Sequence, residues 1–386
     1  MKYIISAHIP TEKAYGHEDV KMCEIMSKAG INVELISPRS ANSVKNNIFE
    51  FYGLEENFSV KYLTTFNYFS IFRNFERFGF YVNWFCFFLR LVFLKTDADA
   101  VIFTRMPEIA WLYKKKKHKV IYECHEWFGR SEKLALYLLR NCDHIITTNR
   151  FIKQKFADAG FAGKKILVAT NGVDLEKFRF ELFKEEAADE LNLDTKLNSL
   201  FKSKTILLYA GSFKTMNVDK GINEILRAMK ILDNNNLFFL AIGGNEPDLK
   251  YYRDMAEKLG VEKQCSFIGR RNQTELALWQ KAADILLAPF PDKAHYRYFM
   301  TPLKLFEYMA AKRPIVASDL PSIREIMNDK NCLFCHPGDA EDLAAKIKKL
   351  LQDKDFGKKL AEQAFEDVKN YSWERRVEKI LNFIIA

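Results

Sequence analysis

The stretch Thr-Pro-Leu-Lys-Leu-Phe-Glu-Tyr-Met-Ala, which begins at Thr301, combines a helix start with one carboxylate among apolar residues. Thr301 is a favoured N-cap residue, and Pro302 suits the first helical position. The backbone N–H groups of Leu303 and Lys304 would then point out of the positive end of the helix dipole, which is an anion-binding arrangement. Glu307, about one turn later, could bind the hydroxyl groups of a ribose whose phosphates rest there. The alternative is a plain capped helix in which Glu307 forms an internal salt bridge.

A second candidate phosphate site follows a predicted strand that ends at Tyr209. Gly211 and Ser212 would allow a ligand to approach the backbone closely, and Lys220 could supply a point charge to a diphosphate. The dipeptide Lys220-Gly221 is too common to indicate anything alone. Its place in the order strand, glycine, Lys-Gly, helix is what favours a phosphate site.

Two series of alternating strands and helices would position these residues. In the first series, apolar β-branched runs predict strands at residues 3–9, 31–37, 100–103, 119–122, 144–147 and 165–169, with a helix at 17–29. In the second series, strands are expected at residues 205–209, 237–242, 264–268, 285–288, 314–318 and 331–334. Strands that alternate with helices form parallel sheets with covered faces. The sequence therefore predicts an α/β protein with two doubly wound, Rossmann-like domains.

A polar, charged stretch without a strand signal separates the two series. We expect an N-terminal domain over residues 1–180, a linker running into a short helix over 181–203, and a second domain over 204–370. A final helix over residues 371–386 is expected to pack back on the N-terminal domain. Open α/β sheets bind ligands at the carboxyl ends of their strands. Two such sheets facing a central cleft would suit an enzyme that brings two substrates together.

The composition limits the classes of partner. The chain has 386 residues, and lysine plus arginine exceed aspartate plus glutamate by 59 − 50 = 9. This excess favours anionic partners, namely a phosphorylated small molecule or an anionic membrane surface. No zinc-finger or RNA-binding signature is present, so nucleic acid is not an expected partner. Seven cysteines without paired spacing, and an N-terminus that predicts a strand, indicate a cytoplasmic protein with reduced thiols.

Several cofactor motifs are absent from the sequence. Neither Gly-x-Gly-x-x-Gly nor Gly-x-x-x-x-Gly-Lys-Ser/Thr occurs, which disfavours a dinucleotide oxidoreductase and a P-loop ATPase. Residues 332–336 match the haem-attachment motif Cys-x-x-Cys-His, but a single copy on a predicted strand edge indicates chance spacing. No other cluster has convincing metal-ligand spacing. We therefore predict neither a metal nor a cofactor.

Phenylalanine is frequent in residues 66–93. The longest apolar run, residues 78–94, contains Asn83 and Arg90 and lacks the clean length of a transmembrane helix. Two interpretations stay open: a buried pair of aromatic-rich helices, or a surface that dips into a membrane carrying a lipid-linked acceptor. The lysines at residues 114–117 predict a solvated turn, with contact to anionic lipid as the alternative.

A set of motifs in fixed order points to a known family. They are Gly211 with Lys220-Gly221, Phe267-Ile-Gly269, Ala283-Asp-Ile-Leu-Leu-Ala-Pro289, Pro302-Leu-Lys-Leu-Phe-Glu-Tyr-Met-Ala310, Pro314-Ile-Val-Ala-Ser-Asp319 and Pro337-Gly-Asp339. Together they closely resemble the C-terminal half of family 4 glycosyltransferases. Val120-Ile-Tyr-Glu-Cys-His125 and Asn171-Gly-Val-Asp-Leu-Glu-Lys-Phe178 resemble the family's N-terminal signatures. The resemblance implies the GT-B fold, an acceptor-binding N-terminal domain, a UDP- or GDP-linked sugar as donor substrate, retention of anomeric configuration and no catalytic metal.

The resemblance assigns donor-binding roles residue by residue. Lys220 matches the lysine that holds the donor diphosphate, and Glu307 matches the glutamate that binds the ribose. Thr301 and Leu303 lie where backbone amides meet the phosphates, and Gly211 lies in the adjoining strand-end loop.

Further matches concern the base, the transferred sugar and the acceptor. Gly269 and Arg270 lie where the nucleobase packs. His125 matches an N-terminal histidine near the transferred sugar and the acceptor, so His125, Lys220 and Glu307 are the predicted catalytic residues; without the match, His125 would be a hydrogen-bonded core histidine. Gly16, expected in the loop after the first strand, lies where the family has a glycine facing donor and acceptor.

Two positions depart from the family pattern. The family often has a second glutamate eight residues before the one at Glu307, where this chain has Phe299. The usual arginine after the glycine of the strand-end loop is Ser212 here. We expect another cation, such as Lys304 or Lys214, to hold the diphosphate, or the donor affinity to be lower.

The expected reaction transfers a sugar to a glycan or lipid-linked acceptor. A leaving phosphate oxygen would take the acceptor's proton, since no side chain is an obvious nucleophile for a double displacement. Two alternatives are a nucleotide-sugar epimerase of the same fold and a non-catalytic nucleotide-sugar binder. The enzyme is expected in the cytoplasm, either free or peripheral at the inner membrane face.

Overall fold

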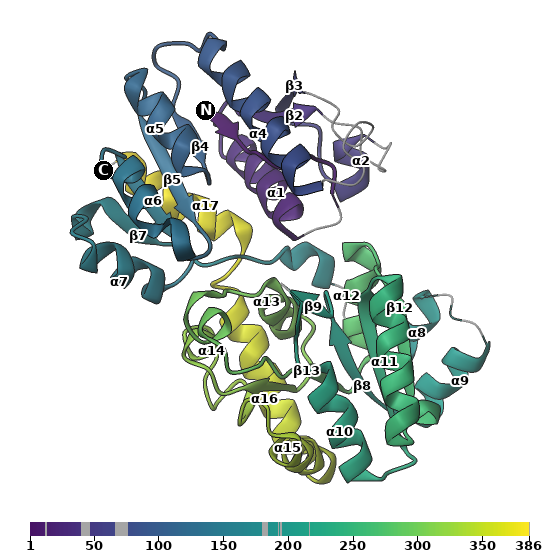
Figure 1. Ribbon diagram of the computed structural model, residues 1–386. Helices are drawn as coiled ribbons and strands as arrows, with labels where there is room; N and C mark the ends of the chain where they lie inside the picture. Colours follow the sequence, from purple (N-terminus) through teal and green to yellow (C-terminus); the bar gives the residue numbers. More distant parts are fainter. Residues whose placement is uncertain are drawn as a thin grey trace. The chain divides into compact units, whose positions relative to one another are not determined.

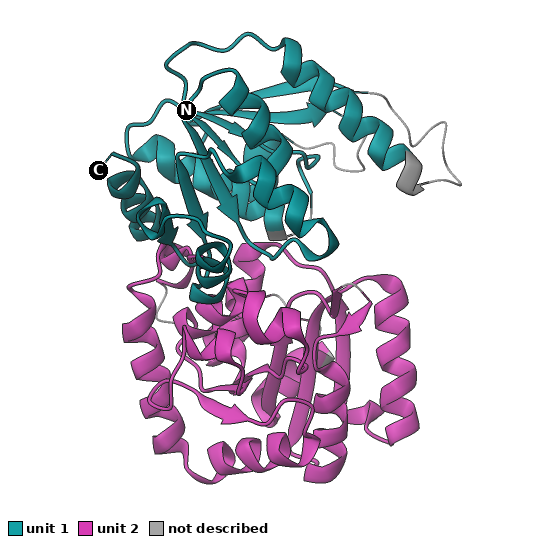
Figure 2. Cartoon of the chain, turned by 60° about the vertical axis from the view of Figure 1, so that its left-hand side comes forward, with its two compact units in different colours: residues 1–170, 373–386 teal, residues 171–372 magenta. Residues whose placement is uncertain are grey.

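The computed structural model describes residues 1–11, 14–39, 47–65, 76–179, 184–191, 193, 195–215 and 217–385 (Figure 1). The chain divides into two compact units, coloured teal and magenta in Figure 2. Unit 1 comprises Met1–Thr170 and Trp373–Ala386, and unit 2 comprises Asn171–Ser372. The two units are described separately below.

The described residues of unit 1 form a seven-stranded sheet in the order β3-β2-β1-β4-β5-β6-β7. All its neighbouring strands are parallel. The strands are β1 (Lys2–Ile4), β2 (Glu34–Arg39), β3 (Ser59–Thr64), β4 (Ile102–Thr104), β5 (Val120–Cys124), β6 (His144–Thr147) and β7 (Ile166–Val168). The sequence did not predict β3, because this edge strand is largely exposed and carries no apolar run.

The helices of unit 1 cover both faces of this sheet. They are α1 (Ala14–Lys28), α2 (Ile48–Tyr52), α4 (Glu76–Phe93), α5 (Pro107–Lys115), α6 (Glu132–Leu139), α7 (Arg150–Asp158), α17 (Trp373–Ile385) and the 3-10 helices η1 (Gly129–Ser131) and η2 (Gly163–Lys165). The connection through α1 leads from β1 to β2, towards one edge of the sheet. The connections through α4, α5 and α6 lead from β3 to β4, from β4 to β5 and from β5 to β6, towards the other edge. Right-handed crossovers therefore place α1 on one face and α4, α5 and α6 on the other. The C-terminal helix α17 packs against α1 (Figure 1).

Unit 2 is a second doubly wound layer structure. Its described residues form a parallel six-stranded sheet in the order β12-β11-β8-β13-β14-β15, and a separate antiparallel hairpin, β9–β10. The strands are β8 (Thr205–Ala210), β9 (Lys214–Thr215), β10 (Val218–Asp219), β11 (Leu237–Gly244), β12 (Cys265–Gly269), β13 (Ile285–Ala288), β14 (Ile315–Ser318) and β15 (Leu333–Cys335). The prediction of two Rossmann-like parallel sheets is confirmed.

Helices pack on both sides of the unit 2 sheet. They are η3 (Leu175–Phe178), α8 (Lys184–Glu190), α9 (Thr195–Ser203), α10 (Ile222–Leu232), α11 (Glu246–Leu259), η4 (Glu262–Gln264), α12 (Gln273–Ala282), the π-helical turn η5 (His295–Phe299), α13 (Leu303–Ala310), α14 (Pro321–Arg324), α15 (Ala340–Gln352) and α16 (Lys354–Val368). Residues 181–203, predicted as a linker running into a short helix, carry two helices in their described part, α8 and α9, so the stretch is more helical than expected. Ala187, Ala188 and Phe201 are buried in the core of unit 2 despite the charged residues around them.

The aromatic-rich helix α4 is only half buried. Phe87 and Leu91 belong to the core of unit 1, whereas Phe80, Phe85 and Phe93 are exposed. The interpretation of this run as a buried helix pair therefore holds for only one face of α4; residues 66–75 lie outside the described part of the chain. Within the described ranges, no helix combines the length and the apolarity needed to cross a membrane.

Candidate functional site

The turn after β8 lies at the carboxyl edge of the unit 2 sheet. Gly211 has φ of 122°, in the left-handed region that favours glycine. Its N–H donates to the carbonyl of Ile242 in β11 at 2.8 Å. A Cβ added to Gly211 would lie 3.1 Å from Cε of Lys304. The backbone of this turn therefore passes directly against a lysine of α13.

Lys220 lies between the β9–β10 hairpin and α10. Its N–H donates to the carbonyl of Phe213 at 3.0 Å, and its Nζ donates to Oγ of Ser212 at 2.9 Å. The Asp219 carboxylate accepts the N–H of Gly221 at 2.7 Å, which fixes the start of α10. Burial lowers the pKa of Lys220 from 10.5 to about 8, because the ammonium loses hydration. The structure thus brings Lys220 back to the turn that holds Ser212.

Lys304 directs its ammonium at the same turn. The residue is 8% exposed, and its Nζ lies 3.4 Å from the ring centre of Tyr209 and 5.4 Å from that of Phe290. Among the described residues, this Nζ has no hydrogen-bond partner. Burial, and then the charge of Lys220, lower the pKa of Lys304 well below its usual value. A buried ammonium without a hydrogen-bond partner, close to a second ammonium, is an arrangement that an anion would complete.

The start of α13 differs from the prediction. Pro302, not Thr301, is the N-cap residue; its backbone is extended, with φ −74° and ψ 125°, and no side chain caps the helix. The carbonyl of Thr301 accepts a hydrogen bond from Nδ2 of Asn171 at 2.9 Å, which holds the chain extended ahead of the helix. The N–H groups of Leu303 and Lys304 belong to the first helical turn and have no intrahelical acceptor. The predicted anion-binding helix start is therefore present without the predicted cap.

Glu307 lies about one turn into α13 and keeps part of its side chain accessible. One carboxylate oxygen accepts a hydrogen bond from Nε2 of Gln280 at 3.1 Å, and Gln280 is fully buried in α12. Burial raises the pKa of Glu307, although the Gln280 hydrogen bond and the charge of Lys304 oppose the rise. In the part of the chain that the structure describes, Glu307 forms no salt bridge. An amide therefore orients this carboxylate and leaves it free to accept further hydrogen bonds.

Tyr308 fixes α13 against the sheet. The residue is fully buried, and its hydroxyl accepts the N–H of Ala210 at 2.7 Å and lies 3.4 Å from the carbonyl of Leu287. Those two residues belong to the ends of β8 and β13. The hydroxyl thereby aligns α13 so that Lys304, one turn earlier, meets Gly211.

Gly269 and Arg270 follow the neighbouring part of the same sheet edge. Gly269 ends β12 and pairs with Gly244 of β11. A Cβ on Gly269 would meet nothing closer than the Gly244 carbonyl oxygen at 3.9 Å, so close packing does not require the glycine. Arg270 is exposed directly after the strand. Their assignment to the nucleobase stays a prediction.

Unit 1 holds a separate charged cluster after β5. Nε2 of His125 lies 3.1 Å from Oε2 of Glu123, and Nδ1 lies 3.3 Å from Oε2 of Glu18. Arg105, which follows β4, contacts the same carboxylates: its Nε lies 2.8 Å from Glu123 and its Nη1 lies 3.1 Å from Glu18. The ring of His125 therefore lies between two carboxylates, both of which also pair with Arg105.

Glu123 is the fully buried centre of this cluster. Its second oxygen accepts a hydrogen bond from Arg376 of α17, which also donates to the carbonyl of Thr170 at 2.9 Å. Burial disfavours the carboxylate, but the charges of Arg376 and Arg105 hold the pKa of Glu123 well below its usual value. Burial raises the pKa of the adjacent Asp19 to about 6, with Arg105 opposing the rise. The two guanidinium groups thus compensate the charge of Glu123, but they do not fully compensate that of Asp19.

Gly16 lies in the first turn of α1 and not in the loop where we expected it. A Cβ at this position would collide with the hydroxyl of Tyr52 and the side chain of Thr11. The same hydroxyl donates to the carbonyl of Thr11 at 2.8 Å. Packing against the chain segment that precedes α1 accounts for the glycine, and its contact with a donor or acceptor stays a prediction.

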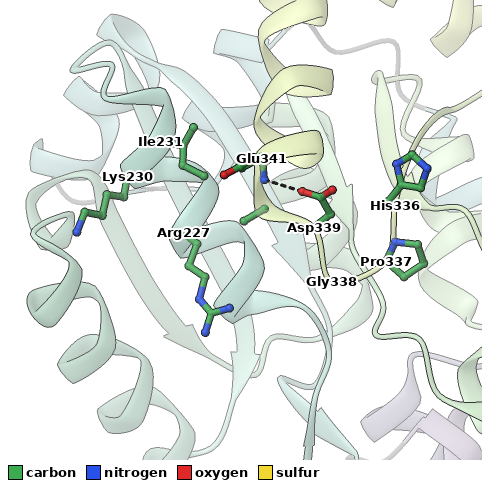
Figure 3. A pocket seen from close by; sticks show the side chains of 9 residues that line it. Arg227, Lys230, Ile231, His336, Pro337, Gly338, Asp339 and Glu341 are labelled. Atoms are coloured by element: carbon green, nitrogen blue, oxygen red, sulfur yellow. Dashed lines mark hydrogen bonds between the residues drawn. The ribbon is translucent and has the colours of Figure 1, made fainter.

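A surface hollow of about 900 Å³ lies elsewhere on unit 2 (Figure 3). Its lining residues come from α10 and from the loop that enters α15; they are Arg227, Lys230, Ile231, His336, Pro337, Gly338, Asp339, Ala340 and Glu341. The carboxylate of Asp339 caps α15 by accepting the N–H of Glu341 at 3.0 Å. None of the predicted site residues lines this hollow, and its helix start is already capped. It is therefore not a candidate for the donor site.

Sequence reasoning missed several residues that shape the two clusters. Arg105 follows a strand directly, so the rule that sites gather at strand ends could have found it. Gln280 directly follows the apolar run Leu276-Ala-Leu-Trp279 of α12, where a polar residue is itself a signal. Arg376 meets Glu123 across 253 positions of sequence, and no local pattern predicts such a contact. The described residues contain no group of His, Cys, Asp and Glu side chains able to hold a metal ion.

Family models match both halves of the chain. The model for Glycosyltransferase Family 4 matches residues 20–177, and the model for glycosyl transferases group 1 matches residues 194–367. An uncharacterized glycosyltransferase of Methanocaldococcus jannaschii is 27% identical over 242 residues, which are 62% of this chain and 58% of that protein. The alpha-monoglucosyldiacylglycerol synthase of Streptococcus pneumoniae is 23% identical over 250 residues, 64% of this chain and 54% of that protein. The matches thus span about half the length of these relatives.

Solved structures share the fold over nearly the whole chain. HepE of Anabaena, solved in complex with UDP, superposes with a TM-score of 0.73 at 14% identity and covers 99% of this chain and 98% of its own. Sucrose-phosphate synthase of Thermosynechococcus elongatus superposes with a TM-score of 0.73 at 18% identity, covering 99% and 97%. These likenesses show the GT-B fold. Together with the two matching models, they establish that the chain belongs to family 4 of the glycosyltransferases.

Proposed function

We propose that the protein is a retaining glycosyltransferase that moves a sugar from a UDP-linked donor to a hydroxyl of a glycan or lipid-linked acceptor. The observation that carries this proposal is the buried ammonium of Lys304, which has no hydrogen-bond partner among the described residues and lies close to Lys220 beside the turn after β8. The printed names of two similar proteins support a UDP-linked donor and sugar transfer. HepE was solved with UDP and with UDP-glucose, and the pneumococcal relative is a monoglucosyldiacylglycerol synthase.

The donor diphosphate is proposed to bind between Lys220 and Lys304. Its negative charge would favour the protonated form of both lysines, against the burial that lowers their pKa values. The N–H of Leu303 adds a backbone donor at the positive end of α13. Glu307, oriented by Gln280, would accept hydrogen bonds from the ribose hydroxyls.

Lys214 and Lys304 are the two cations that could replace the arginine that the family usually has at the position of Ser212. Nζ of Lys214 lies 3.5 Å from a carboxylate oxygen of Asp248 and 4.0 Å from the ring centre of Tyr251, so it is already engaged. Lys304 has no such partner among the described residues. We therefore assign the replacement to Lys304, and Glu307 would act without a second carboxylate at Phe299.

In the proposed reaction the bond between the anomeric carbon and the donor phosphate oxygen breaks. The departing nucleoside diphosphate keeps the electron pair, and Lys220 and Lys304 stabilise the charge that develops on it. The acceptor oxygen bonds to the anomeric carbon on the face that the diphosphate leaves. A phosphate oxygen of the leaving group takes the acceptor's proton, so no covalent intermediate with the protein forms. The contact of His125 with the transferred sugar is carried by the family resemblance alone.

A screen with UDP-, GDP- and ADP-linked sugars, with and without a mixture of glycan and glycolipid acceptors, tests the proposal. We expect nucleotide release from UDP-sugars only when an acceptor is present, and a product with the anomeric configuration of the donor. An inverted product would refute the retaining mechanism. Conversion of the donor without an acceptor would indicate an epimerase, and tight binding without release with any acceptor would indicate a binder.

Binding calorimetry with UDP tests the site itself. Lys304→Met should weaken UDP binding at least tenfold, since a charge-assisted hydrogen bond contributes about 1.5–3 kcal/mol. Glu307→Gln should weaken it less than Lys304→Met does, because an amide still accepts one hydrogen bond from the ribose. Glu257→Gln, an exposed position on α11, is the matched control and should leave the affinity unchanged. Wild-type affinity in both site variants would refute the assignment.

A further inference from the structure

The outer face of α4 carries a stripe of exposed apolar side chains. The exposed fractions are 51% for Phe80, 67% for Tyr81, 55% for Phe85, 41% for Leu89 and 81% for Phe93. Positions 81, 85, 89 and 93 recur every four residues, so their side chains follow one side of the helix along its length. Single exposed apolar residues are normal on soluble proteins, whereas a continuous stripe marks a contact surface.

The opposite face of α4 is fixed to unit 1. Phe87 and Leu91 are buried in the core, and Asn83 is 3% exposed, with its Nδ2 lying 2.9 Å from Nε2 of His8. These contacts hold the helix in place with the apolar stripe outward. The stripe is therefore a fixed surface feature of the folded unit and cannot turn inward without breaking these contacts.

Cations surround the end of this stripe. Nζ of Lys116 donates to the carbonyls of Leu91 and Leu94, at 2.9 and 3.1 Å, and so joins the lysine-rich end of α5 to the last turn of α4. Four exposed cations lie in or next to these two segments: Arg90, Lys95, Lys115 and Lys117. The exposed acidic residues nearby in sequence are Asp97 and Asp99. Cations at positions 90, 95, 115, 116 and 117 outnumber these two carboxylates.

We propose that the outer face of α4 docks on an anionic lipid bilayer, with the helix lying in the plane of the membrane surface. Helices that bind this way combine an aromatic and aliphatic face with neighbouring lysine and arginine. The cations decide between the candidate occupants. A second copy of this chain would present the same positive charges, whereas anionic lipid presents the opposite charge and attracts each cation near the surface. The inference goes beyond sugar transfer and does not depend on it.

Sedimentation with lipid vesicles tests this surface in the full-length protein. We expect the protein to bind vesicles made of equal parts phosphatidylcholine and phosphatidylglycerol much more tightly than vesicles of phosphatidylcholine alone. Phe85→Ser should weaken binding to the anionic vesicles about fivefold. About half of the Phe85 side chain is exposed in the free protein, and the substitution removes this apolar surface from the contact with lipid. Arg90→Gln combined with Lys95→Gln should weaken it about 25-fold, at about fivefold for each cation.

Matched controls lie on unit 2. Ile231→Ser removes an apolar side chain that is 50% exposed on α10, and Lys348→Gln with Lys358→Gln removes two exposed charges. Both controls should bind the anionic vesicles as the unaltered chain does. UDP affinity, measured in all variants, should not change, so loss of docking is distinguished from loss of the donor site.

Three outcomes would overturn the inference. They are equal binding to both kinds of vesicle, equal losses in the α4 variants and their controls, and a dimer in solution that Phe85→Ser dissociates. The last result would assign the surface to a second copy of the chain. The altered side chains at positions 85, 90 and 95 are exposed, so the variants should fold, and circular dichroism of each variant checks this.

Discussion

Replacing Lys220 by methionine should stabilise the ligand-free protein while it weakens donor binding. The pKa of this lysine is about 8 in the folded chain, compared with 10.5 ordinarily, and one pKa unit corresponds to about 1.4 kcal/mol. Below pH 8 the protonated form therefore costs the folded state about 3 kcal/mol relative to the unfolded state. Methionine keeps most of the aliphatic stem and removes the charge, but it loses the hydrogen bond to Ser212, which contributes about 1 kcal/mol. The net gain in unfolding free energy at pH 7 should be roughly 2 kcal/mol.

The stabilising effect of Lys220→Met should decrease as the pH rises. Between pH 8 and 10.5 the unfolded chain binds more protons at Lys220 than the folded chain does, so the penalty shrinks as the pH rises through this window. Scanning calorimetry at pH 7 and at pH 10 should therefore show a stabilising effect of Lys220→Met that is smaller at the higher pH. Lys230→Met, at an exposed position on α10, is the control and should show no such pH dependence. A Lys220→Met variant that is less stable than the unaltered chain at pH 7, or equally stabilised at both pH values, would refute the reasoning.

Two further predictions concern residues that hold the clusters together. Tyr308→Phe removes the hydroxyl that accepts the N–H of Ala210 and leaves a buried donor without a partner; the unfolding free energy in urea should fall by about 1–3 kcal/mol, and no change would show that water replaces the hydroxyl. Arg376→Met leaves the buried carboxylate of Glu123 with Arg105 as its remaining guanidinium partner. This change should cost about 3–5 kcal/mol and speed hydrogen exchange of the β5 amides, while a loss below about 1 kcal/mol would show that Arg105 suffices.

The sequence predicted best the elements that are buried on both faces. The strand at residues 285–288 is found as predicted, because buried parallel strands are continuous apolar runs. The exposed edge strand β3 and the two-residue strands of the β9–β10 hairpin lack such a run and were not predicted. The hairpin matters most for the site, since it returns the chain from Ser212 to Lys220.

Contacts between distant parts of the chain account for the remaining errors. Threonine is a favoured helix N-cap residue, but Nδ2 of Asn171, 130 positions away, donates to the carbonyl of Thr301 and keeps the chain extended there. The charged stretch at residues 181–203 has the composition of a linker, but its small and aromatic residues are buried in unit 2. In both cases a tertiary contact overrode a local preference, which single-sequence patterns do not contain.

The two charged clusters differ in how far their own residues compensate the buried charges. In unit 1, the buried Glu123 carboxylate pairs with two guanidinium groups, so its charge is already compensated in the folded chain. In unit 2, burial lowers the pKa values of Lys220 and Lys304 and raises that of Glu307, so burial disfavours the charged form of each group. A ligand that presents phosphates to the lysines and hydroxyl groups to the carboxylate would reverse all three effects. Perturbed pKa values occur both at functional sites and in structural ion-pair networks. We therefore expect the donor to bind at the uncompensated lysines of unit 2, and we expect the unit 1 cluster to orient His125.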